Sequence, residues 1–382
     1  MKIVHVYKDY YPPVRGGIEQ TVARIAREQV RAGHEVTVLA SASGGRRTVT
    51  EILDGVRVVR VAEWARALSS PICPGFPAEL ARHAADLWHL HHPNPLGELS
   101  WCLVSPPGAL LVTYYAEIVR QKALLPLYAP FLNALLDRAD RIQVISPQAL
   151  SRGGSPLAPH RDKCRCVPLG VDVEPMLALD RNGAAARELR ARFGDPFVLF
   201  VGRLRAYKGL ETLLAAMPGV PARLVIVGDG PMGPGLKAQA AALGLGDQVM
   251  FAGSLDDAGL LDHLAAGGIG VLPSSQPSEA FGLAMVEYLA AGMPAVCTEL
   301  GTGTTFVNEP GRTGLAVPPR DPAALREALK ELAGDPSRRA AFGEEGRRRA
   351  RTMFSTQAMM RGLDELYRET LAISVAHPRS RK

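Results

Sequence analysis

The chain has few aromatic residues, few cysteines and no long uncharged apolar segment. Aromatic side chains make up 6% of its 382 residues, a composition that suits an α/β protein rich in Ala, Leu and Val. The 5 cysteines are an odd number, which leaves no complete disulfide framework, and Cys164 and Cys166 lack the two-residue spacer usual for zinc. No run of about 18 uncharged apolar residues is present, so we expect no membrane-spanning helix.

The amino-terminal segment also lacks the pattern of a secretory signal peptide, because no long apolar stretch leads to a small-residue cleavage site. We therefore expect a cytoplasmic protein. Its net charge of +6 lies within residues 1–170, whereas the remainder is balanced. This asymmetry is either a surface fluctuation or the sign of an anionic partner, such as a phosphorylated acceptor or the acidic inner leaflet, with peripheral contact to that membrane. Nucleic acid is not expected, since no basic stripe interleaved with aromatics appears.

Short apolar segments alternate with helical stretches in both halves of the chain. This alternation predicts right-handed βαβ units and parallel sheets. The fold class expected is α/β, with two Rossmann-like doubly wound domains facing across a cleft and ligand at the carboxyl ends of the strands. The predicted strands are 3–7, 36–40, 56–61, 87–90, 109–113 and 142–145 in the first half, and 197–201, 223–227, 249–251, 269–272 and 295–297 in the second.

A charged, Ala-rich stretch without strand character, residues 172–196, marks the break between the domains. We expect an N-terminal domain over residues 1–171 and a C-terminal domain over residues 172–355. The last helical pattern, residues 356–374, has an apolar stripe that is expected to join it to the N-terminal domain. This stripe contains Met359, Leu363, Leu366 and Tyr367.

Two carboxylates eight positions apart are the most informative feature. Glu279 is expected on the loop before a helix over residues 281–292, and Glu287 within that helix, with its side chain leaning towards the helix start. The backbone N–H groups between them, at Phe281, Gly282 and Leu283, are suited to receive an anion. Two hydroxyl-binding carboxylates beside an anion site fit a sugar–diphosphate–ribose ligand.

Glycine-containing turns follow several predicted strands. Gly16 and Gly17 open a helix after the first strand, where backbone can approach a ligand, or they form a structural turn only. Their spacing is not the Gly-x-Gly-x-x-Gly fingerprint, which counts against a nicotinamide enzyme. Gly228 and Asp229 end another strand, either binding a ligand or packing beside it. Residues 298–305 are small enough for close approach to a nucleotide or sugar, or form a plain surface loop.

Two cations lie on the loop that begins at Gly202. Arg203 and Lys208 are placed to neutralise a diphosphate leaving group as its bond breaks. Arg205 is the alternative contact to Arg203 on sequence grounds.

Taken together, Gly16-Gly17, Gly202-Arg203 with Lys208-Gly209, Gly228-Asp229-Gly230-Pro231 and Glu279-x7-Glu287 resemble the retaining glycosyltransferases of family 4. The likeness extends from Lys2 to about Arg368. Within that family, the segments around His91, around residues 117–122 and around Gly301 resemble the branch of mannosyl- and related hexosyltransferases that build surface polysaccharides and glycolipids.

The resemblance implies a GT-B fold and specific roles. Arg203 and Lys208 would hold the donor diphosphate, Glu279 a hydroxyl of the donor sugar, and Glu287 the ribose hydroxyls. Backbone at Phe281–Leu283 and Gly16–Gly17 would complete the anion site, so no metal and no other cofactor is expected. GDP-mannose is the first-choice donor by resemblance alone.

One position departs from the family pattern. Members usually carry a histidine after the strand 110–113, where it meets the donor sugar, but this chain has Tyr115. Tyrosine donates and accepts hydrogen bonds yet is a poor base near neutral pH. We expect an active enzyme in which Tyr115 belongs to the catalytic set.

Histidines and cations mark the acceptor side. His89 and His91 share one face of a strand and His92 takes the other, and hydrogen bonding is favoured over metal binding because no carboxylate follows at ligand spacing. His91, Arg120 and Lys122 are the candidate acceptor-side residues.

The predicted activity is transfer of a hexose from a nucleotide-sugar to a hydroxyl acceptor, a glycan or lipid-linked sugar, with retention of configuration. Two alternatives stay open: a sugar-nucleotide epimerase of the same architecture, and a catalytically impaired nucleotide-sugar-binding subunit.

Overall fold

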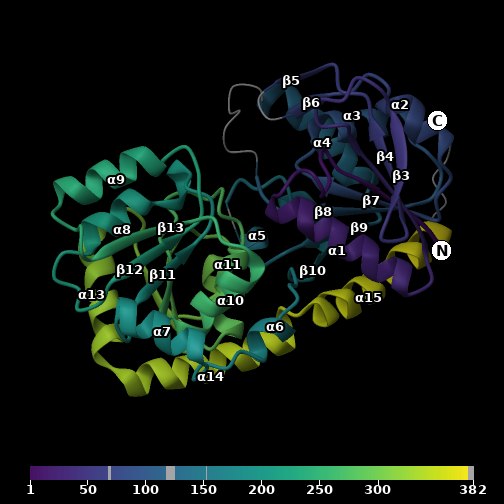
Figure 1. Ribbon diagram of the computed structural model, residues 1–382. Coiled ribbons are helices and arrows are strands. Elements are labelled where there is room, and N and C mark those ends of the chain that lie inside the picture. Colours follow the sequence, from purple (N-terminus) through teal and green to yellow (C-terminus); the bar gives the residue numbers. More distant parts are fainter. Residues whose placement is uncertain (68–69, 118–124, 152, 377–382) are drawn as a thin grey trace. The chain divides into compact units, whose positions relative to one another are not determined.

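The computed structural model describes residues 1–67, 70–117, 125–151 and 153–376 (Figure 1). The chain divides into two compact units, Met1–Pro168 with Met359–Lys382 and Leu169–Ala358. Each unit is built around its own mainly parallel sheet. Among the described residues, no helix combines the length and the apolar character needed to cross a bilayer.

The sheet of the first unit has strand order β10-β9-β8-β7-β1-β2-β4-β3. All neighbours pair in parallel except β3, which lies antiparallel to β4 at the edge. A separate hairpin is formed by β5 (Ala65–Ala67) and β6 (Ser70–Ile72). The strands of the sheet are β1 (Lys2–Val6), β2 (Glu35–Ser41), β3 (Val49–Leu53), β4 (Val56–Val61), β7 (Leu87–His92), β8 (Ala109–Tyr114), β9 (Arg141–Val144) and β10 (Cys164–Cys166).

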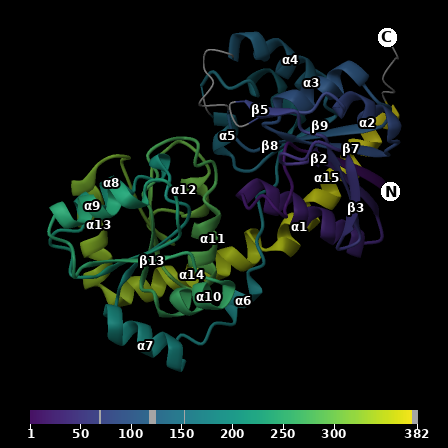
Figure 2. The ribbon, with the colours of Figure 1, turned by 45° about the horizontal axis from the view of Figure 1, so that its top comes forward.

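The helices of the first unit include one from each end of the chain. Figures 1 and 2 show α15 (Thr356–Ala376) beside α1 (Gly17–Arg31). The predicted apolar stripe of α15 is buried, and it packs in one cluster with Ile3, Ile25, Leu87 and Leu111. The others are α2 (Phe76–Arg82), α3 (Pro95–Val104), α4 (Leu125–Arg138), α5 (Gln148–Ser151) and the 3-10 turn η1 (Ala158–Lys163).

The sheet of the second unit has order β13-β12-β11-β14-β15-β16, with parallel pairing throughout. Its strands are β11 (Val198–Val201), β12 (Leu224–Val227), β13 (Val249–Gly253), β14 (Ile269–Leu272), β15 (Ala295–Thr298) and β16 (Gly314–Val317). Its helical elements are α6 (Glu174–Leu177), α7 (Ala184–Phe193), η2 (Ala206–Lys208), α8 (Leu210–Ala216), α9 (Gly233–Ala242), α10 (Asp257–Ala266), α11 (Leu283–Ala290), α12 (Thr304–Val307), α13 (Pro322–Gly334) and α14 (Pro336–Met353).

Strand order reverses once in each sheet. In the first unit β1 lies between β2 and β7, and in the second β11 lies between β12 and β14. Because the chain leaves such neighbouring strands in opposite directions, their carboxyl ends leave room between the following loops, where α/β proteins bind ligands. The segments after β11 and β14 therefore meet at one edge.

The predicted α/β architecture is confirmed, with strand ends shifted by at most two residues. The sequence patterns missed β3, β10, β16 and the hairpin, since a three-residue strand or an exposed edge strand leaves a weak apolar signal. The helix expected over residues 281–292 is shorter, spanning Leu283–Ala290. Gly282, just before this helix, and Gly292, just after it, take positive φ values of 84° and 75°. This left-handed conformation does not fit within an α-helix and so limits its length at both ends.

Candidate functional site

A buried ion pair joins the two loops at the point where strand order reverses in the second sheet. Lys208 follows β11 and Glu279 follows β14, and the Lys208 Nζ donates to Glu279 Oε2 at 2.6 Å. Their side chains are only 12% and 10% exposed. The backbone connects the same loops, since the Ser275 N–H donates to the Tyr207 carbonyl at 2.7 Å. Two residues that sequence analysis singled out separately thus form one charged unit.

Hydroxyl groups fix the Glu279 side chain and backbone. Ser274 Oγ donates to Glu279 Oε2 at 2.9 Å, and Thr302 Oγ1 donates to the Glu279 carbonyl at 2.7 Å. Thr298 donates to the Ser274 carbonyl in turn. The small residues after β15, expected to permit close approach of a ligand, therefore also hold the loop that carries Glu279.

The charge of Lys208 is set by two opposing effects. Burial lowers the pKa of its ammonium group, but the Glu279 carboxylate and Tyr207 raise that pKa by more, so that it lies above its ordinary value. An ammonium group has three N–H donors. One is used by Glu279, and the Tyr207 side chain is a second hydrogen-bond partner.

The residues between the two carboxylates form the start of α11. Gly282 is the residue before the helix, with φ 84, and a Cβ there would lie 2.7 Å from Leu272 Cδ2. The Phe281 ring is buried against Phe354, with ring centroids 5.8 Å apart, so only its backbone is offered to a ligand. Leu283 is the first helical residue, and Glu287 is half-buried one turn further along. The positive end of the helix dipole favours an anion here.

Two glycine turns pack directly on each other beside the ion pair. A Cβ on Gly228 would lie 2.2 Å from the Gly202 carbonyl oxygen, so no larger residue fits without displacing backbone. Asp229 uses a carboxylate oxygen to accept from the Ser254 N–H at 2.9 Å. The structure thus gives Asp229 a role in anchoring the loop after β13.

Arg203 is exposed, and within the described ranges its side chain makes no hydrogen bond or ion pair. It differs in this from Lys208, which already has a carboxylate partner. A guanidinium group without a partner keeps its planar set of donors for a phosphate.

In the first unit, Gly16 caps α1 and Gly17 begins it. A Cβ on Gly16 would lie 2.1 Å from Glu19 Oε2, so the glycine leaves space for this carboxylate over the helix start. Anion binding by Gly16 and Gly17 stays a prediction.

Tyr115 lies one residue beyond β8 and is buried. The distance between its hydroxyl and His91 Nδ1 is 3.0 Å, and its N–H donates to the His92 carbonyl at 3.2 Å. Burial, followed by the charge of Glu19, raises the pKa of the Tyr115 hydroxyl. Tyr115 is therefore neutral and unsuited to act as a base. Arg120 and Lys122, the other acceptor-side candidates, lie outside the described residues.

Three histidines, His5, His89 and His91, gather on one face of the first sheet with their nitrogens close enough to hold a metal ion. Each of the six ring nitrogens already has a hydrogen-bond partner, so metal binding would require several of these bonds to break. His92 lies on the opposite face, where Nδ1 contacts Glu98 at 3.1 Å. The hydrogen-bonding interpretation of this cluster is the one that its contacts support.

Comparison with known proteins relates this geometry to a family. A model described as glycosyl transferases group 1 matches residues 184–349, and one described as glycosyltransferase family 4 matches residues 15–175. The D-rhamnosyltransferase WbpZ of Pseudomonas aeruginosa is 36% identical over 363 residues, covering 93% of this chain and 92% of that protein. The chain belongs to the family 4 glycosyltransferases.

Other known proteins resemble this glycosyltransferase in sequence or in fold. The O-antigen chain mannosyltransferase C of Escherichia coli is 32% identical over 371 residues, with 96% of this chain and 98% of that protein covered. Sucrose-phosphate synthase from Thermosynechococcus elongatus superposes with a TM-score of 0.79 at 25% identity, covering 97% and 99% of the two chains. The two Rossmann-like sheets of the glycosyltransferase are therefore those of the GT-B fold.

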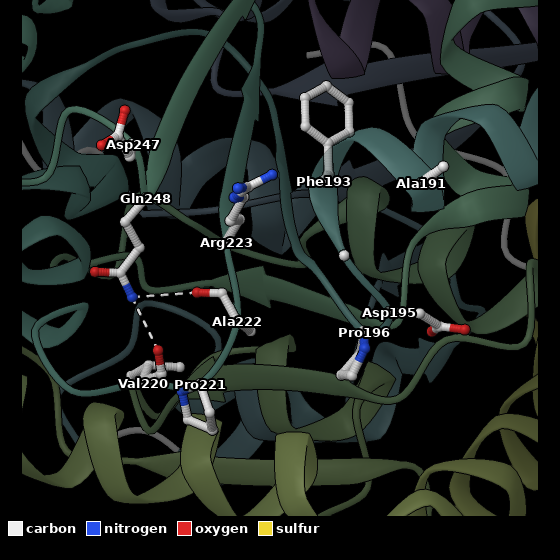
Figure 3. A pocket seen from close by; sticks show the side chains of 11 residues that line it. Ala191, Phe193, Asp195, Pro196, Val220, Pro221, Ala222, Arg223, Asp247 and Gln248 are labelled. Carbon is white, nitrogen blue, oxygen red and sulfur yellow. Dashed lines mark hydrogen bonds between the residues drawn. The ribbon is translucent and has the colours of Figure 1, made fainter.

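A surface hollow on the second unit lies away from these residues. Figure 3 shows Pro196, Arg223 and Gln248 among the residues that line it, with the Gln248 amide donating to the Val220 and Ala222 carbonyls. Pro196 and Arg223 precede β11 and β12, so the hollow adjoins the amino ends of these strands. No candidate site residue of the glycosyltransferase lines it.

Sequence reasoning missed the supporting roles of several residues. Ser274, Thr298 and Thr302 carry hydroxyls that hold Glu279, and Gln29 and Tyr367 bind the histidine cluster. The first three lie near the glycosyltransferase motifs and follow apolar strands, which is a usable signal. Gln29 sits on an amphipathic helix, where nothing local marks it as a buried polar residue, and the apolar stripe that contains Tyr367 gives no sign of a polar partner.

The histidine cluster predicts that acid destabilises the glycosyltransferase. Burial lowers the pKa of His5 from 6.5 to about 4 and holds the pKa values of His89 and His91 well below normal. Since the unfolded chain binds protons more readily, stability is complete above pH 6.5 and falls as pH drops towards these lowered values. The lowered pKa of His5 alone should reduce the free energy of unfolding by about 2 kcal/mol near pH 5.

Urea denaturation between about pH 8 and about pH 5, above the range where most carboxylates titrate, measures this loss. The variant His83→Gln, which removes a histidine outside the cluster, should show the same pH dependence as the parent. An unfolding free energy that stays constant or rises on acidification would contradict the neutral, buried state of the three rings.

Proposed function

We propose that this glycosyltransferase moves a hexose, with mannose the first choice, from a nucleotide-sugar such as GDP-mannose to a hydroxyl of a lipid-linked or polysaccharide precursor, with retention of configuration. The observation that carries the proposal is the buried Lys208–Glu279 pair at the reversal point of the second sheet. It combines a cation for phosphate and a carboxylate for sugar hydroxyls within one hydrogen bond of each other.

Each candidate has a role in holding the donor. Lys208 and Arg203 bind the diphosphate, Glu279 accepts from a donor-sugar hydroxyl, and Glu287 accepts from the ribose hydroxyls. The start of α11 adds backbone donors and the positive end of its dipole. The glycine turns at Gly202 and Gly228 let the diphosphate approach the backbone closely, while Asp229 keeps the adjoining loop in place.

In the proposed reaction, the bond between the sugar anomeric carbon and the diphosphate oxygen breaks. The acceptor hydroxyl oxygen bonds to that carbon on the same face, and its proton passes to the leaving phosphate oxygen. The products are the glycoside and the nucleoside diphosphate. Lys208 and Arg203 stabilise the negative charge that develops on the leaving group. This charge stabilisation is the role that a divalent ion fills elsewhere, so the proposal includes no metal.

A lipid-linked acceptor is supported by the surface of the first unit and by the relatives. The helix α4 exposes Leu127 by 72% and Phe131 by 47%, one turn apart on the same side, and the excess positive charge lies in residues 1–170. Exposed apolar side chains on a unit with excess positive charge suit peripheral contact with an anionic leaflet. Relatives include a mannosyltransferase of O-antigen chains and a phosphatidyl-myo-inositol mannosyltransferase.

A transfer assay tests the proposal. GDP-mannose, followed by other nucleotide-sugars, is incubated with lipid-linked acceptor in anionic vesicles. Nucleoside diphosphate should appear only with acceptor, the product should keep the anomeric configuration of the donor, and EDTA should leave the rate unchanged. Rising salt should slow the reaction on vesicles, because screening weakens surface charge attraction. Conversion of the sugar-nucleotide without acceptor would indicate an epimerase instead, and donor binding without turnover a binding subunit.

The two carboxylates should separate in steady-state kinetics. Glu279→Gln is expected to lower kcat, because a contact to the donor sugar strengthens as the ring flattens in the transition state; the loss should be about 1.5–3 kcal/mol. Glu287→Ala is expected to raise the donor KM with little change in kcat, because a ribose contact is equal in both states. Glu327→Gln, an exposed carboxylate on α13, is the control. Near-normal kinetics for both site variants would refute these assignments.

A further inference from the structure

A continuous chain of buried hydrogen bonds crosses the first sheet and ends at Tyr115. Polar side chains from β9, β8, β7 and β1 lie side by side on one face, and Gln29 of α1 and Tyr367 of α15 connect them. On the β9 side, Gln143 Nε2 lies 2.8 Å from the Val167 carbonyl, Thr113 lies 2.6 Å from Gln143, and His89 Nε2 lies 2.6 Å from Thr113. The two helices continue the chain, with 2.8 Å from Tyr367 to His89 Nδ1, 2.6 Å from Gln29 Nε2 to Tyr367 and 2.7 Å from His5 Nε2 to Gln29 Oε1. The last two distances are 2.9 Å from His91 Nε2 to His5 Nδ1 and 3.0 Å from the Tyr115 hydroxyl to His91 Nδ1.

The strand register explains why these side chains meet. His5 pairs with His89, His91 with Thr113, and Thr113 with Gln143. All of them point to the face that α15 covers. The amino half of that face is apolar, and the polar residues occupy its carboxyl half, next to the edge where ligands bind in such sheets.

A backbone carbonyl sets the direction of the chain at one end. The Val167 oxygen only accepts, so Gln143 must present its NH₂ group there and its Oε1 to Thr113. Thr113 therefore donates to Gln143, and its oxygen accepts from His89 Nε2–H. A neutral imidazole has one donor and one acceptor nitrogen, so His89 Nδ1 must accept from Tyr367.

The same reasoning carries the direction to the other end. The Tyr367 oxygen accepts from the Gln29 NH₂ group, which leaves Gln29 Oε1 to accept from His5 Nε2–H. His5 Nδ1 then accepts from His91 Nε2–H, and His91 Nδ1 accepts from the Tyr115 hydroxyl. Every member donates in one direction, and each of the three histidines carries its proton on Nε2.

We propose that this chain commits the Tyr115 proton to His91, so that Tyr115 offers a sugar hydroxyl only an acceptor oxygen, and that Tyr367 is a positioning residue acting through the chain. Tyr115 is then a residue that determines specificity for a hydroxyl donor on the sugar. Its part in sugar recognition rests on the proposed function and on the expectation that the position after β8 meets the donor sugar, whereas the direction of the chain stands on the contacts alone.

A double-mutant cycle on kcat/KM tests whether Tyr367 acts through Tyr115. Tyr367→Phe keeps the ring, removes the link between Gln29 and His89, and should lower kcat/KM about tenfold, the scale of one hydrogen bond. In a Tyr115→Phe background the same change should have no further effect. The control is Thr370→Val on the same helix, where the buried hydroxyl donates within α15, to the Leu366 carbonyl at 2.6 Å. Independent, multiplicative losses from Tyr367→Phe and Tyr115→Phe would overturn the positioning role.

Histidine tautomers give a second readout, which does not depend on activity. In ¹⁵N-histidine NMR near neutral pH, His5, His89 and His91 should all be neutral with the proton on Nε2, and Tyr367→Phe should change the signals of His89, His5 and His91. A proton on Nδ1 of His91, or a charged ring in the cluster, would overturn the inference. An enzyme inert with every nucleotide-sugar but with the predicted tautomers would count against the proposed function and leave the direction of the chain intact.

Discussion

The ion pair between Lys208 and Glu279 is the contact around which the candidate site is organised. Removing two charges from water costs several kcal/mol per ion in proteins, and a buried pair often contributes little net stability. The contacts around the pair are therefore better explained by the need to hold the two side chains in place than by a gain in the stability of the fold. Ser274 and Thr302 hold Glu279, the Tyr207 carbonyl joins the two loops, and Gly282 is the residue before the helix that follows.

Both sheets of the glycosyltransferase place polar groups at the edge where their strands end. In the second unit the polar groups are charged and lie on loops, which leaves cationic groups available to a ligand. In the first unit they are neutral histidine, glutamine and tyrosine side chains within the core, linked to one another by hydrogen bonds. Satisfied polar networks are rigid, so this arrangement suits an element that must hold one orientation, such as the Tyr115 hydroxyl.

Much of the fold follows from local patterns. Apolar strands such as Val56–Val61 and Ile269–Leu272 begin and end where their sequences predict, because most of their side chains are buried and their apolar runs are short and well delimited. The edge strand Val49–Leu53 was missed, since most of its side chains face solvent and no continuous apolar run marks it.

Individual residues of the candidate site could be predicted from the sequence, but most contacts between them could not. The spacing of Glu279 and Glu287 predicted a loop followed by a helix, and the helix is present. A contact across 71 residues, such as that between Lys208 and Glu279, depends on which strands become neighbours. The contact of His89 with Tyr367 spans 278 residues. Alternating polar residues in otherwise apolar strands gave a hint of that network, whereas its partner helix carried none.

The central claim is that a nucleoside diphosphate binds at the loops after β11 and β14 and at the start of α11. Hydrogen–deuterium exchange with and without GDP, and then UDP, locates the binding site directly. The account predicts slower exchange in residues 202–209 and 279–287 when the preferred nucleotide is added. Protection confined to the hollow around Pro196, Arg223 and Gln248, or no protection in these two loops with either nucleotide, would contradict it.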